Sequence, residues 1–510
     1  MASHLPSTIP SLSESSPLLP PPRPPSPPSI FKPTLTTLNA FALLISIIIG
    51  SGIFASPAAI DTNVPSPALA LSVWLLGGLL AWTGAATMAS LGTTFPSAGG
   101  IQPILRHAYG DAVGFAAAWA FTTIVMPATA AILALVFAES VAQALGGAPL
   151  WAEKLAAIGV VLLVAGANAV STSLSNRLST FFLAAKALTI TLLVLAGLGV
   201  VFAHIVHPGR GGIGGDDWYR RNWFAKRPSI TPGGTIDWAK IGWWEGLGRY
   251  SAGVYGALWA YAGWDKANYV AGELRDPARQ LPLALNTALP AVAACYVAVN
   301  AAYYVLLPWA EVGMTDAIAV NAIKSLLGPI PALITACLIV IVILGSLSGN
   351  LFVAGRITVA AAGRNWFPQA LGRIGSIFGT QPSDPAVTPA HDAPINALLL
   401  TTLLSSGYIL LGTFRTLVTL DGLTEYAFFF LTVLADLVLR VREPRLQRPY
   451  RVPVVVPLVF CIVSGAVVVR GALFAPVQAA VVVVVLAVGG VVYVVRGVRG
   501  ALESERALVS

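Results

Sequence analysis

The sequence predicts an all-α polytopic membrane protein with about 12 transmembrane helices. Of its 510 residues, 56% are hydrophobic and only 10% are charged, whereas soluble domains carry roughly 25% charged residues. Apolar segments of about 20 residues, each long enough to cross a bilayer core of about 30 Å, recur along the chain. The first and the sixth of these segments contain small residues near their middle. We therefore expect a 5+5 inverted repeat with broken first and sixth helices, followed by two C-terminal helices.

Proline and serine dominate residues 1 to about 30, so we expect residues 1–34 to form a disordered cytosolic tail. This segment is not a signal peptide, because it has no apolar core region. Within it, the run from Glu14 to Leu19 (ESSPLL) has the form of an acidic dileucine sorting signal. So short a pattern also arises by chance, and a pair of leucines without a role is the alternative.

The remaining chain divides into two predicted repeats and two further helices. The first repeat covers 35–207, an extracellular loop covers 208–247, and the second repeat covers 248–440. Helices 11 and 12 follow at 441–497, before a short cytosolic tail at 498–510. The predicted spans lie near 37–60, 68–92, 113–144, 155–174, 179–204, 248–270, 285–308, 328–356, 394–412, 416–440, 452–471 and 474–495.

Basic residues set the predicted orientation, because short cytosolic loops are rich in Lys and Arg. With the N-terminus inside, the short outer loops and adjacent helix ends hold only Lys154, Lys324, Arg415 and Arg470. Both termini are then cytosolic, and an amphipathic stretch from Phe95 to Tyr109 lies at the inner surface. The net charge of +8 follows from the inner loops and needs no nucleic-acid partner.

The long outer loop at 208–247 has mixed charges and several tryptophans. This composition predicts partial folding over the outer mouth, with aromatic rings at the level of the lipid headgroups. The plasma membrane is the expected location of the protein. A vacuolar or endosomal membrane is the alternative that the run from Glu14 to Leu19 leaves open.

The stretch Gly50-Ser51-Gly52-Ile53-Phe54 interrupts the first span. Each glycine costs roughly 1 kcal/mol relative to alanine inside a helix, so the helix is expected to break here. In lipid, a break is tolerated only where the freed backbone groups face protein, water or a ligand. The alternative is that these glycines let a neighbouring helix pack closely.

The sixth span has a matching interruption from Tyr255 to Asp265, where small residues lie between large aromatic ones (YGALWAYAGWD). Five spans separate the two interruptions, so they occupy corresponding positions in two halves of opposite orientation. A pair of broken helices of this kind indicates an inverted-repeat secondary transporter whose site lies near the membrane midplane.

The two breaks favour one kind of ligand. The outer half of the first span begins near Ile53, and its unpaired N–H groups present the positive end of a helix dipole to an anion. Free carbonyl groups near Ile48 and from Trp259 to Ala262 suit an ammonium group. Amides on one side and carbonyls on the other match an α-amino acid zwitterion, whose side chain would enter a mostly apolar pocket.

The residues around these breaks resemble the L-type amino acid transporters of the amino acid, polyamine and organocation superfamily, and specifically a fungal-type member. The resemblance covers about residues 35–495, and it implies a secondary active transporter that moves L-amino acids by alternating access, as a proton symporter or an exchanger. The implied substrates are neutral, with large neutral or cationic amino acids as alternatives. The matching motifs lie at 48–54, 259–264, 268–277, 281–284, 440–444 and 448–453.

The resemblance also implies roles for individual residues. The backbone N–H groups of Ser51, Gly52 and Ile53 would bind the substrate carboxylate. On the eighth span, the side chain of Asn350 would contribute to the substrate site, with Ser346 facing the same region. Trp259 would also act as the outer aromatic gate. The carbonyl groups that would hold the substrate ammonium belong to Ile48, Trp259, Ala260 and Ala262.

Lys186 on the fifth span matches a family lysine that faces the first break. A charge at mid-membrane costs about 2.5 to 3.5 kcal/mol, so we expect this lysine to line the cavity or to carry a function. Its ammonium would stabilise the broken helix in place of a sodium ion, or it would take part in proton coupling. The alternative is that the Lys186 side chain reaches the cytosolic interface.

Two positions depart from the family pattern. Ala262 stands where glycine is usual, which narrows the approach to the backbone and points to a changed substrate size. Asp265 stands where an amide is usual, which points to proton coupling or a cationic substrate. The alternative for Asp265 is an internal ion pair with Lys186, because the adjacent Lys266 would point about 100 degrees away on an α-helix.

Glu273 and Arg275 lie where an inner gate would close, and a solvated or paired carboxylate is the alternative reading of Glu273, as it is for Glu425. The loop from Gly146 to Glu153 contains no cysteine. The disulfide to a single-span heavy chain that animal members of the family use is therefore not expected.

Several classes of function are not supported. The chain shows no nucleophile, base and oxyanion constellation and no nucleotide-binding loop, so we expect neither an enzyme nor an ATP-driven pump. Its three cysteines and five histidines lack metal-ligand spacing, so no metal or cofactor is expected. A non-transporting amino acid sensor on the same fold is the competing class, and the short N-terminal tail disfavours it. A channel is disfavoured because no ring of filter residues is visible.

Overall fold

The computed structural model describes residues 35–509, except 97–98, 145–146, 171, 208–212, 232–233, 315–316 and 376–392. Side chains are described outside 143–146, 170–180 and 498–510. The predicted tail at 1–34, with its run from Glu14 to Leu19, lies outside the described residues. Within them, the protein is built from helices and one short β-hairpin, so the predicted all-α polytopic class is confirmed.

The helices of the first half follow the predicted spans. The first span is bent by 46° between α1 and α2, and the third passes through a π-helical turn, η1, between α5 and α6. The predicted amphipathic stretch forms α4, which is short because left-handed glycines, Gly100 and Gly110, flank it. The elements are α1 (Thr37–Ile48), α2 (Gly52–Asp61), α3 (Pro67–Thr94), α4 (Ile101–Tyr109), α5 (Asp111–Ala120), η1 (Phe121–Val125), α6 (Met126–Ala144), α7 (Leu150–Val170) and α8 (Thr172–Val206).

The second half begins after a partly folded loop that contains a short helix and an antiparallel hairpin. Two 3-10 helices, η2 and η3, interrupt the α-helices that follow. The elements are α9 (Asp217–Arg220), β1 (Ser229–Thr231), β2 (Gly234–Ile236), α10 (Trp243–Ala260), η2 (Trp264–Glu273), α11 (Pro277–Leu306), α12 (Trp309–Val312), α13 (Ile318–Leu327), α14 (Pro329–Gly363), η3 (Gln369–Gly372), α15 (Ile395–Leu411), α16 (Phe414–Arg442), α17 (Val455–Phe474) and α18 (Pro476–Val509).

Most of these helices are long and apolar enough to cross a membrane. Among the described residues, nine pass this test alone, and the bent pair of α1 and α2 makes a tenth span. The predicted sixth and ninth spans correspond to α10, which is more polar, and to α15, which has 17 residues. Ten of the predicted spans therefore correspond to helices, or a bent pair, of membrane-spanning length and composition, and α10 and α15 occupy the positions of the other two.

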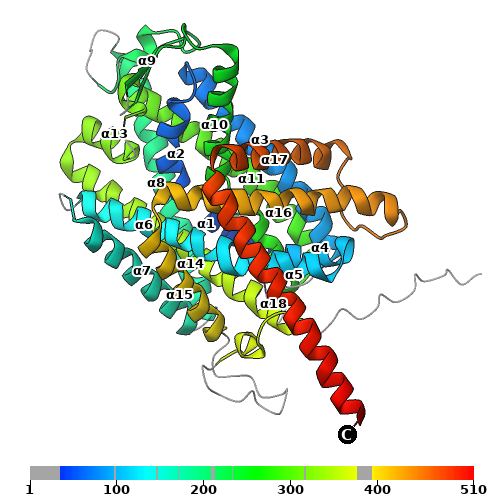
Figure 1. Ribbon diagram of the computed structural model, residues 1–510. Helices are drawn as coiled ribbons and strands as arrows, with labels where there is room; N and C mark the ends of the chain where they lie inside the picture. Colours follow the sequence, from blue (N-terminus) through cyan, green and yellow to red (C-terminus); the bar gives the residue numbers. More distant parts are fainter. Residues whose placement is uncertain are drawn as a thin grey trace, which may run out of the picture.

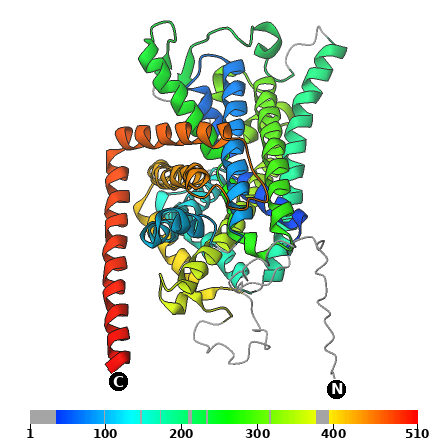
Figure 2. The ribbon, with the colours of Figure 1, turned by 90° about the vertical axis from the view of Figure 1, so that its right-hand side faces the viewer.

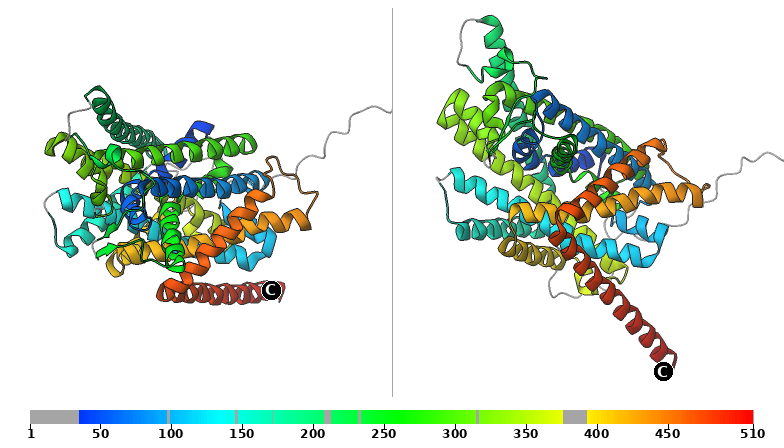
Figure 3. Two further views of the ribbon diagram at one scale, coloured as in Figure 1. Left: turned by 90° about the horizontal axis from the view of Figure 1, so that it is seen from above. Right: turned by 45° about the horizontal axis from the view of Figure 1, so that its top comes forward.

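The two broken helices lie at the centre of the molecule. α1 packs against α11, and α2 and α10 pack against each other and against α3, while α1 and η2 also contact α14 (Figure 1). On the other side of the breaks, α6 packs against both α14 and α16. α18 lies at the edge of the molecule (Figures 2 and 3), and only 11% of its most apolar window is buried. Such an uncovered apolar helix is suited to contact with lipid.

The structure differs from the sequence prediction in three elements. The chain after the second break forms the 3-10 helix η2 rather than an α-helix, and its residues from Trp264 to Ala271 are all buried, so tertiary packing overrides local preference. α18 continues to Val509, past the end predicted near 495. The short helix α13, which precedes α14, was not predicted, because its ten residues are too few for a span.

The loop before α10 holds the end of α2. Asp61, the last residue of α2, is buried and forms an ion pair with Arg227 of the loop. Arg227 also donates to the Trp309 carbonyl oxygen at 2.9 Å, and the Tyr304 hydroxyl of α11 donates to Asp61. The predicted partial folding of this loop is confirmed. Its contacts connect the outer half of the first span to α11 and α12.

Candidate substrate site

The first break separates α1, which ends at Ile48, from α2, which begins at Gly52. The first backbone hydrogen bonds of the outer piece are donated by Phe54 and Ala55 to the Ser51 oxygen, at 3.0 and 2.9 Å. Among the described residues, no backbone carbonyl accepts a hydrogen bond from the amides of Ser51, Gly52 or Ile53. These amides therefore form the positive end of the α2 dipole.

The structure agrees with both interpretations of the glycine motif, a break in the helix and the close packing of a neighbouring helix. A Cβ atom on Gly52 would lie 2.6 Å from the Ala260 Cα atom, so the two broken helices touch at this residue. A Cβ atom on Gly50 would lie 2.9 Å from the Ser346 Oγ atom of α14. The glycines therefore permit close packing and also lie at the helix break.

The second break begins where α10 ends at Ala260. The Ala262 amide donates to the Trp259 oxygen at 3.0 Å, and Gly263 then adopts a left-handed conformation with a φ of 101°. A Cβ atom on Gly263 would lie 2.6 Å from the Ile47 side chain. Glycine is required here both by the backbone angle and by the close approach of α1.

Tyr296 of α11 connects the two breaks. Its buried hydroxyl lies 2.9 Å from the Ile48 oxygen and 3.0 Å from the Ala260 oxygen, which are two of the carbonyls predicted to hold the substrate ammonium. The Ile48 oxygen also accepts from the Gly50 amide at 2.9 Å. Because a hydroxyl has a single hydrogen to donate, at least one of the two carbonyl oxygens keeps a lone pair for a ligand. Sequence reasoning missed Tyr296, although a tyrosine within an apolar span signals a hydroxyl that needs a partner.

Lys186 of α8 faces the first break, where the resemblance places it. Its ammonium donates to the oxygens of Ser46 and Ile49 and to the Ser346 hydroxyl, the last at 2.9 Å. The side chain is fully buried, so the alternative in which it reaches the membrane interface is wrong. A cation at the C-terminal carbonyls of α1 complements the helix dipole.

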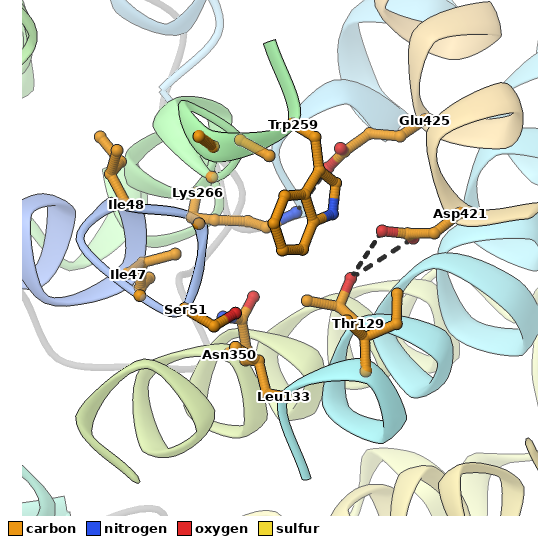
Figure 4. A pocket seen from close by; sticks show the side chains of 16 residues that line it. Ile47, Ile48, Ser51, Thr129, Leu133, Trp259, Lys266, Asn350, Asp421 and Glu425 are labelled. Carbon is orange, nitrogen blue, oxygen red and sulfur yellow. Dashed lines mark hydrogen bonds and ion pairs between the residues drawn. The ribbon is translucent and has the colours of Figure 1, made fainter. Parts of the chain in front are cut away.

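One cavity lies between the two breaks and the wall formed by α6, α14 and α16 (Figure 4). Its empty volume is about 500 Å³, including space open to solvent. The Ser51 hydroxyl and the Asn350 Oδ1 atom are buried at this cavity without a hydrogen-bond partner in the part of the chain that the structure describes. Buried polar atoms are normally paired, so these two atoms indicate room for a polar ligand. The lining residues are Ile47, Ile48, Gly50, Ser51, Gly52, Thr129, Ile132, Leu133, Trp259, Ala260, Ala262, Gly263, Lys266, Asn350, Asp421 and Glu425.

Of the residues predicted for the substrate site, all but Ile53 line this cavity, and the two predicted coupling residues do not. Ile53 is fully buried beside the break, so only its amide is placed to contribute. Lys186 lies behind the first break and Asp265 behind the second, both outside the cavity lining. Trp259 does line the cavity, and its ring packs edge-on against Phe414 at the start of α16. Its role as a gate stays a prediction.

Asp265 forms an ion pair, but not with Lys186. The Lys266 ammonium lies 3.4 Å from the Asp265 carboxylate and 3.0 Å from that of Glu425. Adjacent residues diverge by about 120° in the 3-10 helix η2, so the backbone does not bring this pair together. The long Lys266 side chain places its ammonium between the two carboxylates. Glu425, left open as solvated or paired, is paired. Lys266, Asp421 and Thr129 are cavity residues that sequence reasoning missed.

Glu273 lies away from the cavity, at the end of η2. Its carboxylate pairs with Arg356 of α14 at 3.1 Å, and both side chains are buried. Arg275, the other residue predicted at an inner gate, is exposed, and its amide donates to the Leu35 oxygen at 3.2 Å. The Leu35 amide in turn donates to the Glu273 oxygen at 2.9 Å, so the chain before α1 pairs with the chain after η2.

Comparison with known proteins gives the family. A model of the amino acid permease family matches residues 35–495, which places the chain among membrane permeases. It is 28% identical over 433 residues to the b(0,+)-type amino acid transporter 1 of Homo sapiens, covering 84% of this chain and 80% of that one. It is also 28% identical over 432 residues to the large neutral amino acids transporter small subunit 2 of Mus musculus, covering 84% and 74%.

The chain therefore belongs to the amino acid permease family and, within it, to the L-type amino acid transporters. These relatives confirm amino acid transport as the general function and confirm that the protein is not an enzyme. The fungal-type branch stays a prediction.

Replacing Gly52 with valine is expected to abolish amino acid uptake in proteoliposomes without preventing membrane insertion, because the new side chain would overlap Ala260. The matched control is Gly166→Val on α7, where a Cβ atom meets open space, and this variant should keep wild-type uptake. Normal uptake by Gly52→Val would remove the first break from the site.

Replacing Lys186 with methionine is expected to lower uptake by about tenfold or more, since hydrogen bonds from a charged group contribute about 1.5 to 3 kcal/mol. Initial uptake rates at several pH values measure the effect. Lys324→Met, at an exposed position of α13, is the control. Wild-type uptake by Lys186→Met would contradict a role at the break, and active transport that has lost its pH dependence would indicate proton coupling instead.

Proposed function

We propose that this protein is a secondary active transporter that moves L-amino acids across a membrane by alternating access. The observation that carries the proposal is the cavity between the two broken helices. On one side it offers the unpaired amides of Ser51 and Gly52. On the other side it offers carbonyl groups at Ile48 and at the end of α10.

The amides receive the substrate carboxylate, because a helix N-terminus favours an anion and its N–H groups point at the ligand. Asn350, whose Oδ1 atom has no partner, and the carbonyl oxygens of Ile48 and Ala260 accept hydrogen bonds from the ammonium group. Beyond these groups, Ile132 and Leu133 of α6 give the cavity an apolar part, beside polar and charged residues of α6, η2 and α16. The apolar part suits the side chain of a neutral α-amino acid, and large neutral amino acids are named among the relatives' substrates.

Two sets of contacts serve as gates in this proposal. The buried ion pair of Glu273 with Arg356, together with the backbone pairing of Leu35, closes the side of the molecule that the positive-inside rule assigns to the cytosol. Trp259, which packs on Phe414, closes the other side once a substrate is bound. Opening of the inner gate then requires η2 and α14 to separate.

The membrane orientation and the partners follow from the same proposal. Both termini lie in the cytosol, and the protein resides in the plasma membrane or, through the run from Glu14 to Leu19, in a vacuolar or endosomal membrane. One relative is named as a small subunit. For this chain we propose no disulfide-linked partner, because the loop from Gly146 to Glu153 lacks cysteine.

Purified protein in proteoliposomes should take up labelled neutral L-amino acids, and the conditions identify the coupling. Uptake driven by an inward proton gradient indicates a symporter, whereas uptake that requires amino acid inside the vesicle indicates an exchanger. Empty liposomes and the Gly52→Val variant are the controls. If no amino acid is taken up or exchanged under either condition, the transporter proposal fails, and binding without uptake would favour a sensor.

A further inference from the structure

The wall of the cavity opposite the first break carries two carboxylates. Asp421 and Glu425 lie one turn apart on α16 and therefore share a helix face. Both are buried, at 4% and 3% exposure, and both line the cavity. Figure 4 shows the Asp421 carboxylate beside Thr129, across the cavity from Ser51.

The charges of this wall do not balance. Lys266 is the one cation that lies within ion-pair distance of any of the buried carboxylates of Asp265, Asp421 and Glu425 in the described part of the chain. It pairs with Asp265 and Glu425, so Asp421 has no cationic partner among the described residues. An ionised carboxylate away from water is costly unless a cation or several hydrogen bonds compensate it.

The hydrogen bonding of Asp421 is also incomplete. The Thr129 hydroxyl lies 3.3 and 3.2 Å from its two carboxylate oxygens, but the same hydroxyl lies 2.8 Å from the Val125 carbonyl oxygen. A hydroxyl has a single hydrogen to donate. The shorter contact favours the backbone oxygen, so Asp421 is left as a carboxylate that faces the cavity and needs a donor.

We infer that Asp421 forms a subsite for the positively charged end of a substrate side chain, so that the protein accepts basic amino acids such as arginine and lysine. This inference rests on the proposed function, which places the substrate carboxylate at Ser51 and Gly52. The methylene groups of the side chain pass between Trp259 and Leu133, and the charged end reaches Asp421. The Trp259 ring adds a cation–π surface for a guanidinium group.

Other ligands fit this wall less well. An acidic side chain would be repelled by the carboxylates of Asp421 and Glu425. The Lys266 ammonium would not compensate it, because it already forms ion pairs with two carboxylates. A metal ion is not supported either, because no group of three or more His, Cys, Asp or Glu side chains among the described residues could hold one. A proton is the remaining cation, and the experiment below separates it from a basic side chain.

The test compares L-arginine with L-citrulline, its uncharged analogue of nearly the same shape. Purified protein should bind arginine at least about tenfold more tightly than citrulline, since a hydrogen bond to a charged group is worth about 1.5 to 3 kcal/mol. Competition against labelled leucine uptake and ligand-induced thermal stabilisation both measure the ratio. In Asp421→Asn this ratio should fall close to one.

The matched control is Asp237→Asn, at a carboxylate of the outer loop that pairs with exposed Lys240, and it should keep the wild-type ratio. The ratio does not depend on how much variant protein folds, and thermal stabilisation measures it even if Asp421→Asn no longer transports.

Three results would overturn the subsite. One is a wild-type protein that does not prefer arginine, the second is an Asp421→Asn variant that retains the preference, and the third is a variant that loses only the pH dependence of uptake. The last result would assign a proton to Asp421. Leucine uptake without recognition of arginine would leave the proposed function intact, whereas absence of all amino acid uptake would remove the proposed function itself.

Discussion

The bond between the Lys186 ammonium and the carbonyl oxygens at the end of α1 is the interaction on which the site depends. A helix broken in mid-membrane leaves carbonyls on one side of the break and amides on the other, without water to satisfy them. Lys186 and the Ser346 hydroxyl satisfy the carbonyls of Ser46 and Ile49, and Tyr296 satisfies that of Ile48. In the other half, the amides of Ser51, Gly52 and Ile53 donate to no backbone carbonyl of the described chain.

This asymmetry explains why the site selects a carboxylate first. Side chains of the protein already donate hydrogen bonds to the carbonyl oxygens on one side of the break. The N–H groups at the start of α2 still need an acceptor, and the positive end of the helix dipole favours an anion there. The ammonium group of a substrate adds to carbonyls that already have one partner. On the opposite wall of the cavity, Lys266 forms an ion pair with Glu425, whereas Asp421 has no cationic partner among the described residues.

The sequence predicted the spans, the two breaks and the residues of these breaks that line the cavity, because these features depend on local composition. The length of an apolar segment indicates a membrane-spanning helix, and small residues in its middle indicate a break in that helix. The position of Lys186 was also predictable, since a charge within a span needs a reason. What could not be predicted depends on contacts between distant segments. Tyr296 and Asp421 are polar residues within apolar spans, but their sequence neighbours do not indicate that folding places them at the cavity and its breaks.

The error over Asp265 has the same origin. Lys266 meets Asp265 where its ammonium also pairs with Glu425 of α16, a residue far along the chain that only folding brings close. Arg356 was missed as the partner of Glu273 for a related reason. Their ion pair joins η2 to α14, and no local pattern indicates which of many arginines meets a given carboxylate.

The most direct measurement is a cryo-electron microscopy structure of the protein with a bound L-amino acid. We predict that the carboxylate oxygens of the ligand lie about 3 Å from the amide nitrogens of Ser51 and Gly52, as hydrogen-bond geometry requires. A carboxylate bound at the Lys266 ammonium, or anywhere else away from the first break, would contradict the assignment of these amides as the substrate anchor.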